Sequence, residues 1–226
     1  MVIGWGIIQM PTTSTLEWIT PYQTWLSEEQ SLNNAQLVVN HFIGSDWSRE
    51  SLSAMLGNMR HESSVNPNMY EYGYEWEEDR GFGLVQWTPR SKYWDWAVSN
   101  GLDPYSGNSQ LARINYEVDN NIQYIPNGHQ RRYGNGDKYD FTFAEYRSNS
   151  VGESLHNLVE AFMWNYEGPS YSAGTDSLGD RKAFATRCYN ELDWSGTGGG
   201  VTPTPVENGN EIITLLLCGA LNGWYR

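Results

Sequence analysis

The 226-residue sequence predicts an α+β fold that is mainly α, with a small β-hairpin. Apolar residues recur at i, i+3, i+4 and i+7 in several stretches, and polar N-cap residues precede most of them, which favours helices. Residues 81–87 (GFGLVQW) alternate weakly and contain flanking glycines, which favours a strand or hairpin. The length fits one domain of ordinary size together with tails.

Composition changes divide the chain into four segments. Residues 1–31 are apolar and aromatic but broken by prolines, and we interpret them as an N-terminal arm. Residues 32–194 carry the helical patterns and form the predicted domain. Residues 195–210 have the composition of a Gly/Thr/Pro linker, and residues 211–226 form an apolar segment that we expect to dock on a partner. Its uninterrupted apolar part is far shorter than the roughly 20 residues needed to span a bilayer, so no stable transmembrane span is predicted.

Five helices are predicted in chain order. The first is capped by Asn33 and ends at Gly44, and the second is capped by Ser48 and cannot continue beyond Pro67. The other three are expected at residues 109–125, after a capping box at residues 150–153, and at residues 180–192.

Composition also limits the partners. The net charge of −13 argues against nucleic acid, because phosphate binding needs clustered Lys and Arg. The four histidines and two cysteines lack the spacing of a zinc site, so no metal or cofactor is expected. The 11 Trp and 15 Tyr suit sugar stacking or interfaces, although core filling is the alternative for each of them.

Glu62 is the candidate catalytic acid. At about 100° per residue, it lies roughly 70° from the centre of the apolar stripe of the second helix, whereas His61 points away from that stripe. A half-buried carboxyl loses solvation, which raises its pKa and suits a general acid. From position alone, an ordinary helix-end glutamate is the competing interpretation.

Three spaced motifs carry a resemblance to a known family: residues 57–68 (GNMRHESSVNPN), 81–89 (GFGLVQWTP) and 162–169 (FMWNYEGP). In this order they resemble the phage tail-associated lysozymes and, more distantly, goose-type lysozymes and lytic transglycosylases. The resemblance covers residues 32–193 approximately. It implies a mainly helical lysozyme-like domain with a small β-hairpin beside the active-site cleft.

The resemblance implies that Glu62 protonates the oxygen between N-acetylmuramic acid and N-acetylglucosamine. An inverting hydrolase also needs a second carboxylate, roughly 6.5–9.5 Å away, to activate water. Asp79 is the first choice for this base among the acids of the loop before the hairpin, which are Glu71, Glu75, Glu77, Glu78 and Asp79. A lytic transglycosylase would need no second acid.

The same motifs supply candidate substrate contacts. Ser63 and Gln86 are expected to contact or position the sugar, since a glutamine offers both a donor and an acceptor to an N-acetyl group. Trp87 and Tyr166 could line the cleft, although Tyr166 also continues a core stripe. Glu167 is expected to be mainly a structural acid near the cleft.

The predicted function is therefore that of a peptidoglycan-degrading muramidase of a phage tail tip. It would belong to the virion, bind other tail proteins through its apolar N- and C-terminal segments, and open the host cell wall locally during DNA entry. Two alternatives stay open: a lytic transglycosylase, and a structural tail-tip protein whose lysozyme-like domain binds glycan without cleaving it.

Overall fold

The computed structural model describes residues 16–75, 77–134 and 138–196, and this part of the chain is mainly helical, as predicted. The predicted docking segment, most of the predicted linker and the first 15 residues of the arm lie outside the described residues. The helices, in chain order, are α1 (Glu28–Phe42), α2 (Arg49–Ser63), α3 (Ser91–Ser99), α4 (Gly107–Asp119), α5 (Gly128–Tyr133), α6 (Phe143–Ser148), α7 (Leu155–Phe162), the π-helical turn η1 (Met163–Glu167) and α8 (Tyr171–Glu191).

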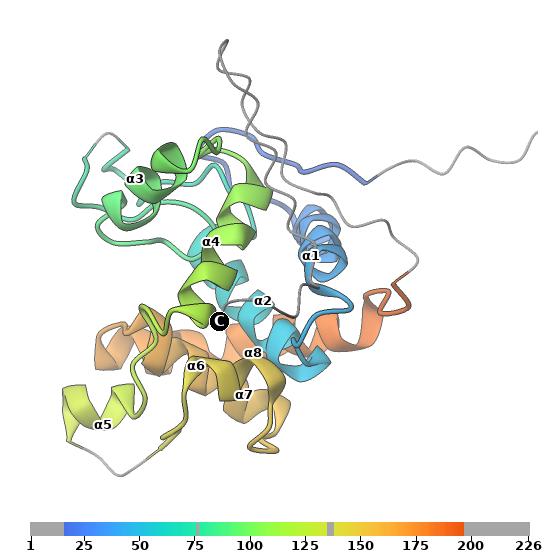
Figure 1. Cartoon of the computed structure of the whole chain (residues 1–226), viewed down its shortest axis with the longest axis vertical. Helices are drawn as coiled ribbons and strands as arrows, with labels where there is room; N and C mark the ends of the chain where they lie inside the picture. Colours follow the sequence, from blue (N-terminus) through green and yellow to red (C-terminus); the bar gives the residue numbers. More distant parts are fainter. Residues whose placement is uncertain (1–15, 76, 135–137, 197–226) are drawn as a thin grey trace, which may run out of the picture.

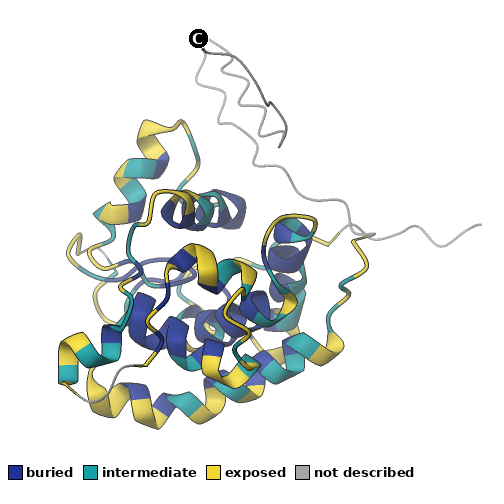
Figure 2. Cartoon of the chain, turned by 60° about the horizontal axis from the view of Figure 1, so that its bottom comes forward, coloured by how far each residue is buried: buried dark blue, intermediate teal, exposed yellow. Residues whose placement is uncertain are grey.

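Helix α2 lies in the middle of the molecule (Figure 1) and packs most extensively against α8 and α7. Its residues from Ser51 to Met59 are all buried. Exposed residues of the fold gather on the outward-facing sides of the helices (Figure 2). Glu62, in the last turn of α2, lies where this central helix emerges from the core.

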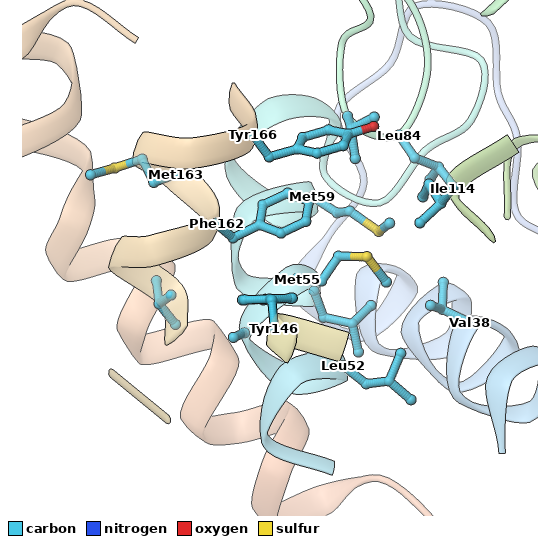
Figure 3. Packing of buried hydrophobic residues seen from close by; sticks show 14 of the residues in the cluster. Val38, Leu52, Met55, Met59, Leu84, Ile114, Tyr146, Phe162, Met163 and Tyr166 are labelled. Carbon is cyan, nitrogen blue, oxygen red and sulfur yellow. The ribbon is translucent and has the colours of Figure 1, made fainter. Parts of the chain in front are cut away.

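The core around α2 is built from methionine and aromatic side chains (Figure 3). On one side of α2, Phe162 and Tyr166 stack with ring centroids 4.5 Å apart. Met55 and Met59 fill the space between these rings and the side chains of α1 and α4, and all of them are buried. Met55 and Met59 are spaced i, i+4 and so share one helix face, and the same holds for Phe162 and Tyr166. This spacing is the pattern that predicted the two helices.

One of the predicted N-caps agrees with the structure and two do not. Ser48 caps α2 as predicted, with its side chain accepting a hydrogen bond from the backbone N–H of Ser51. The first helix begins earlier than predicted, because Ser27, not Asn33, forms a capping box with Gln30. Helix α7 is capped by Ser154, whose side chain accepts from Asn157, in place of the predicted box at residues 150–153.

Helix lengths differ from the predictions as well. Helix α4 ends at Asp119, before the predicted boundary at residue 125, and Asn121 and Gln123 adopt positive φ angles just beyond it. Helix α8 begins at Tyr171 instead of residue 180, because Ser170 provides an N-cap that accepts from Ala173. Among the described helices, none is both long and apolar enough to cross a membrane.

The small β-hairpin is not confirmed. Within the described ranges there is no strand, and the segment that leads to Trp87 makes only two isolated antiparallel bridges, Tyr70 with Phe82 and Phe82 with Trp87. The reason lies in the backbone: Gly83 and Gln86 have φ angles of 84° and 49°, so the chain turns where the alternating pattern predicted extension. Gln86 stabilises this turn by donating from Nε2 to the carbonyl oxygens of Met69 and Gly83, each at 3.1 Å.

Gly57 allows the close crossing of α2 and α8. A methyl group at this position would collide with the carbonyl oxygen of Arg181 and lie 2.9 Å from the Cβ of Ala185. Gly57→Ala is therefore expected to lower the free energy of unfolding by about 1–3 kcal/mol, since backbone cannot give way cheaply. The measurement is urea unfolding followed by circular dichroism.

Gly179 on α8 is the matched control for this substitution. It is exposed, and a Cβ there would meet nothing within 4 Å, so Gly179→Ala should raise stability by about 0.5–1 kcal/mol through the better helix propensity of alanine. A loss of stability at Gly179 equal to that at Gly57 would contradict the packing explanation.

Candidate active site

Glu62 is held by a buried arginine from α8. Arg181 donates from Nη2 to Glu62 Oε1 at 2.5 Å and from Nη1 to Asn58 Oδ1 at 2.7 Å. Its Nε donates to Ser177 Oγ at 3.1 Å. The side chain of Arg181 is 2% exposed and that of Glu62 is 19% exposed, so the pair lies at the edge of the core. The hydrogen bonds to Asn58 and Ser177 fix the guanidinium group, and its one hydrogen bond to Oε1 orients the Glu62 carboxylate.

The open side of Glu62 faces a cavity of about 320 Å³. Glu62 is half-buried while its neighbour His61 is exposed, which agrees with the orientations that the helical phase of α2 predicts. The cavity brings together residues from the arm, the end of α2, the loop after it and η1. They are Trp25, Glu62, Met69, Tyr70, Glu71, Tyr72, Gln86, Thr88, Glu167 and Pro169.

Glu167 is the second carboxyl group of this cavity. It ends the π-helical turn η1, and its Oε1 atom is shielded from solvent with no hydrogen-bond partner in the described structure. Burial raises the pKa of Glu167 well above its usual range, the charge of Glu62 raises it further, and Arg181 opposes the shift. Glu167 is therefore suited to hold a proton beside Glu62.

The acidic loop contributes one carboxyl group to the cavity. Glu71 lines it, accepts a hydrogen bond from Gly81 N at 3.1 Å and lies 3.6 Å from Arg80 Nη1. Asp79, the base first chosen from the sequence, is an exposed residue of the same loop and is not among the cavity-lining residues.

Gln86 and Ser63, two of the candidates from the sequence, lie in the turn that borders the cavity and at the end of α2. Gln86 lines the cavity from the turn described above. Ser63 is fully buried, and its Oγ lies 3.1 Å from Met59 O and 2.9 Å from Leu84 O. The serine hydroxyl thus joins the end of α2 to the turn that carries Gln86, and it does not line the cavity.

Trp87 and Tyr166 are buried behind the cavity, where they meet a carboxylate. Glu117 of α4 accepts from Trp87 Nε1 at 3.0 Å, from Arg113 Nε at 2.8 Å and from the hydroxyl of Tyr166. Burial raises the pKa of Glu117, while the hydrogen bonds from Tyr166, Arg113 and Trp87 oppose that shift. The network connects the residue after Gln86 with the residue before Glu167, and so links two walls of the cavity.

The sequence interpretation did not include Arg181 or Glu117. A signal for Arg181 was present, because it precedes Phe184 by three residues and Cys188 by seven, which places it on the same helix face. An arginine on a buried face requires a carboxylate partner. Glu117 has a weaker signal, its i, i+4 spacing from Arg113 on a helix with apolar neighbours.

No group of three or more histidine, cysteine or acidic side chains is arranged to hold a metal ion in the part of the chain that the structure describes. The cavity is lined by carboxyl groups, a glutamine amide and aromatic side chains, together with Met69, Thr88 and Pro169.

Residues 33–192 match the family model described as phage tail lysozyme, and this is more than half of the chain. The protein belongs to the phage tail lysozyme family. One similar protein is "Morphogenesis protein 1" of Bacillus phage B103, which is 37% identical over 146 residues. That match covers 65% of the present chain but only 36% of the phage B103 protein, so the chain spans little more than a third of its relative.

Proposed function

We propose that this protein is a muramidase that cleaves the glycan strands of peptidoglycan, with Glu62 as the general acid. The observation that carries the proposal is the position of the Glu62 carboxylate, which is oriented by Arg181 at the wall of a cavity with two further carboxyl groups. Membership of the phage tail lysozyme family supports the same reaction.

For the second carboxylate we favour Glu71 over Asp79. A general base must reach the water that attacks the sugar, and Glu71 lines the cavity whereas Asp79 lies exposed in the loop. The backbone N–H of Gly81 holds one oxygen of Glu71 and leaves the other toward Arg80. The base is thus anchored on the side of the cavity formed by the loop.

Glu167 has a different role in this proposal. Burial favours the neutral form of Glu167, in which its carboxyl group offers an O–H donor next to Glu62. A neutral carboxyl group can donate a hydrogen bond to a sugar hydroxyl or to the carbonyl of an acetamido group. Gln86 adds an amide to the same cavity.

The family match and the similarity to the phage B103 protein support a proposal for where the protein acts. A phage tail lysozyme is expected in the virion, in contact with other phage proteins, and a relative named as a morphogenesis protein supports this assignment. We propose that the enzyme opens the host cell wall locally from the tail. The apolar segment at residues 211–226 remains our proposed docking segment.

The test is the action of the purified protein on isolated peptidoglycan, with mass analysis of the released muropeptides. We expect fragments with reducing N-acetylmuramic acid ends. Fragments with 1,6-anhydro ends would instead identify a lytic transglycosylase. Binding to the wall without release of fragments would contradict catalysis and support the glycan-binding alternative.

A further inference from the structure

The described part of the arm, residues 16–26, is attached to the domain by side-chain amides that pair with the backbone. Asn34 of α1 accepts from Ile19 N and donates to Ile19 O, both at 2.8 Å. Gln23 makes the same kind of pair with Tyr70, accepting from its N at 2.8 Å and donating to its O at 3.1 Å. Each pair fixes one residue of the arm against a buried part of the domain.

The end of the arm is fixed as well. Asn66 donates from Nδ2 to Pro21 O at 2.8 Å and to Thr24 O at 2.9 Å. The backbone N–H of Leu26 donates to Ser64 Oγ at 2.8 Å, and the side chain of Leu26 is buried. Trp25 is thus held between two anchored residues.

Trp25 nevertheless remains 54% exposed. It makes no hydrogen bond and no ring contact with another described residue, and it lines the cavity that Glu62 faces. Trp18 on the same arm contrasts with it, because its indole N–H donates to Asn108 Oδ1 at 3.0 Å and its ring packs on Gly107. Core packing therefore explains Trp18 and not Trp25.

A second exposed aromatic residue, Tyr72, lines the same cavity and is 86% exposed. Exposed aromatic side chains at the opening of a cavity are candidates for binding, because their flat apolar faces lose unfavourable contact with water when a ligand covers them. Trp25 also lies before the residues that match the family model, 33–192. The family match therefore does not account for it.

We propose that Trp25 and Tyr72 form an aromatic subsite that stacks on an N-acetylhexosamine ring of the glycan strand next to the cleavage point. The inference rests on the proposed function for the choice of glycan. A neutral N-acetylated sugar fits the site better than an anionic wall polymer, because the cavity carries carboxyl groups and the chain has a net charge of −13.

The test measures binding without turnover, in a Glu62→Gln background, using a soluble tetramer of N-acetylglucosamine and isothermal titration calorimetry. Trp25→Ala should weaken binding about tenfold, as is common for a central aromatic contact, while Trp25→Phe should retain most of the affinity. Tyr171→Ala is the matched control, since Tyr171 is exposed but does not line the cavity.

On isolated peptidoglycan, Trp25→Ala in the otherwise unchanged protein should raise KM and leave kcat nearly unchanged. Equal affinity of the Trp25→Ala variant and its parent would overturn the subsite, and so would an equal loss in Tyr171→Ala. Absence of saturable binding by the parent would overturn it too. Failure of the proposed function is a separate result, namely a wild-type protein that binds the tetramer through Trp25 but releases no muropeptides.

Discussion

Glu62→Gln is expected to lower the rate of muropeptide release by a factor of about 10²–10⁴, which is the usual contribution of a general acid. The amide of glutamine cannot supply a proton to the glycosidic oxygen. It can still accept the hydrogen bond from Arg181, but it leaves this buried arginine without a counter-charge, so a lower melting temperature is expected together with the loss of activity. The measurement is the initial rate of release from isolated peptidoglycan, with the melting temperature recorded alongside.

Glu160→Gln is the matched control. The side chain of Glu160 is 16% exposed, close to the 19% of Glu62, and it is also ion-paired, with Lys138 at 3.0 Å and Lys182 at 3.7 Å. It does not line the cavity. A Glu62→Gln variant with full activity would overturn the assignment, as would an equal loss of activity in Glu160→Gln.

The central helix shows how far the sequence alone could go. The stripe from Leu52 to Met59 predicted a buried face, and the cap at Ser48 predicted its start, because both are local patterns on one helix. The phase of that stripe also distinguishes half-buried Glu62 from exposed His61. These properties depend on spacing along one element and need no knowledge of its neighbours.

The partners of Glu62 depend on packing between distant elements, and for that reason they were not predicted. Arg181 is 119 positions away in sequence and reaches Glu62 only because α8 crosses α2 at Gly57. The turn at Gly83 and Gln86 illustrates a second difficulty. A weak alternation predicts a strand, but left-handed φ angles and side-chain hydrogen bonds to Met69 O determine the backbone there.

A second large effect is expected at the buried pair of Arg113 and Glu117 behind the cavity. Their side chains are 8% and 1% exposed, with a distance of 2.8 Å between Arg113 Nε and Glu117 Oε1. Glu117→Gln leaves the arginine without its counter-charge, and loss of one partner of a buried pair costs about 3–5 kcal/mol. Trp87 donates to Glu117 Oε1 and Tyr166 to Oε2, so the single oxygen of glutamine keeps only one of these acceptors, and the loss combines the missing charge with one changed hydrogen bond.

A double-mutant cycle with Arg113→Met isolates the interaction between the two side chains. Removing both charges should restore a large part of the stability that Glu117→Gln loses, because no buried charge is then left unpaired. Urea unfolding at neutral pH gives the four free energies of the cycle. The same variants should also lose activity, because the network holds Trp87 and Tyr166, which adjoin the cavity residues Gln86 and Glu167. The variant that displaces these two aromatic side chains further should lose more activity.

Helix α8 provides a matched pair with the same residues, order and spacing. Arg187 and Glu191 are also at i, i+4, with 2.9 Å between Arg187 Nη2 and Glu191 Oε2, but their side chains are 35% and 48% exposed. Water and salt screen such a pair, so its coupling energy should not exceed about 0.5 kcal/mol. Arg187 also pairs with Glu28, so this cycle is measured in a Glu28→Gln background. Equal coupling in both cycles would then show that burial does not determine the strength of the Arg113–Glu117 interaction.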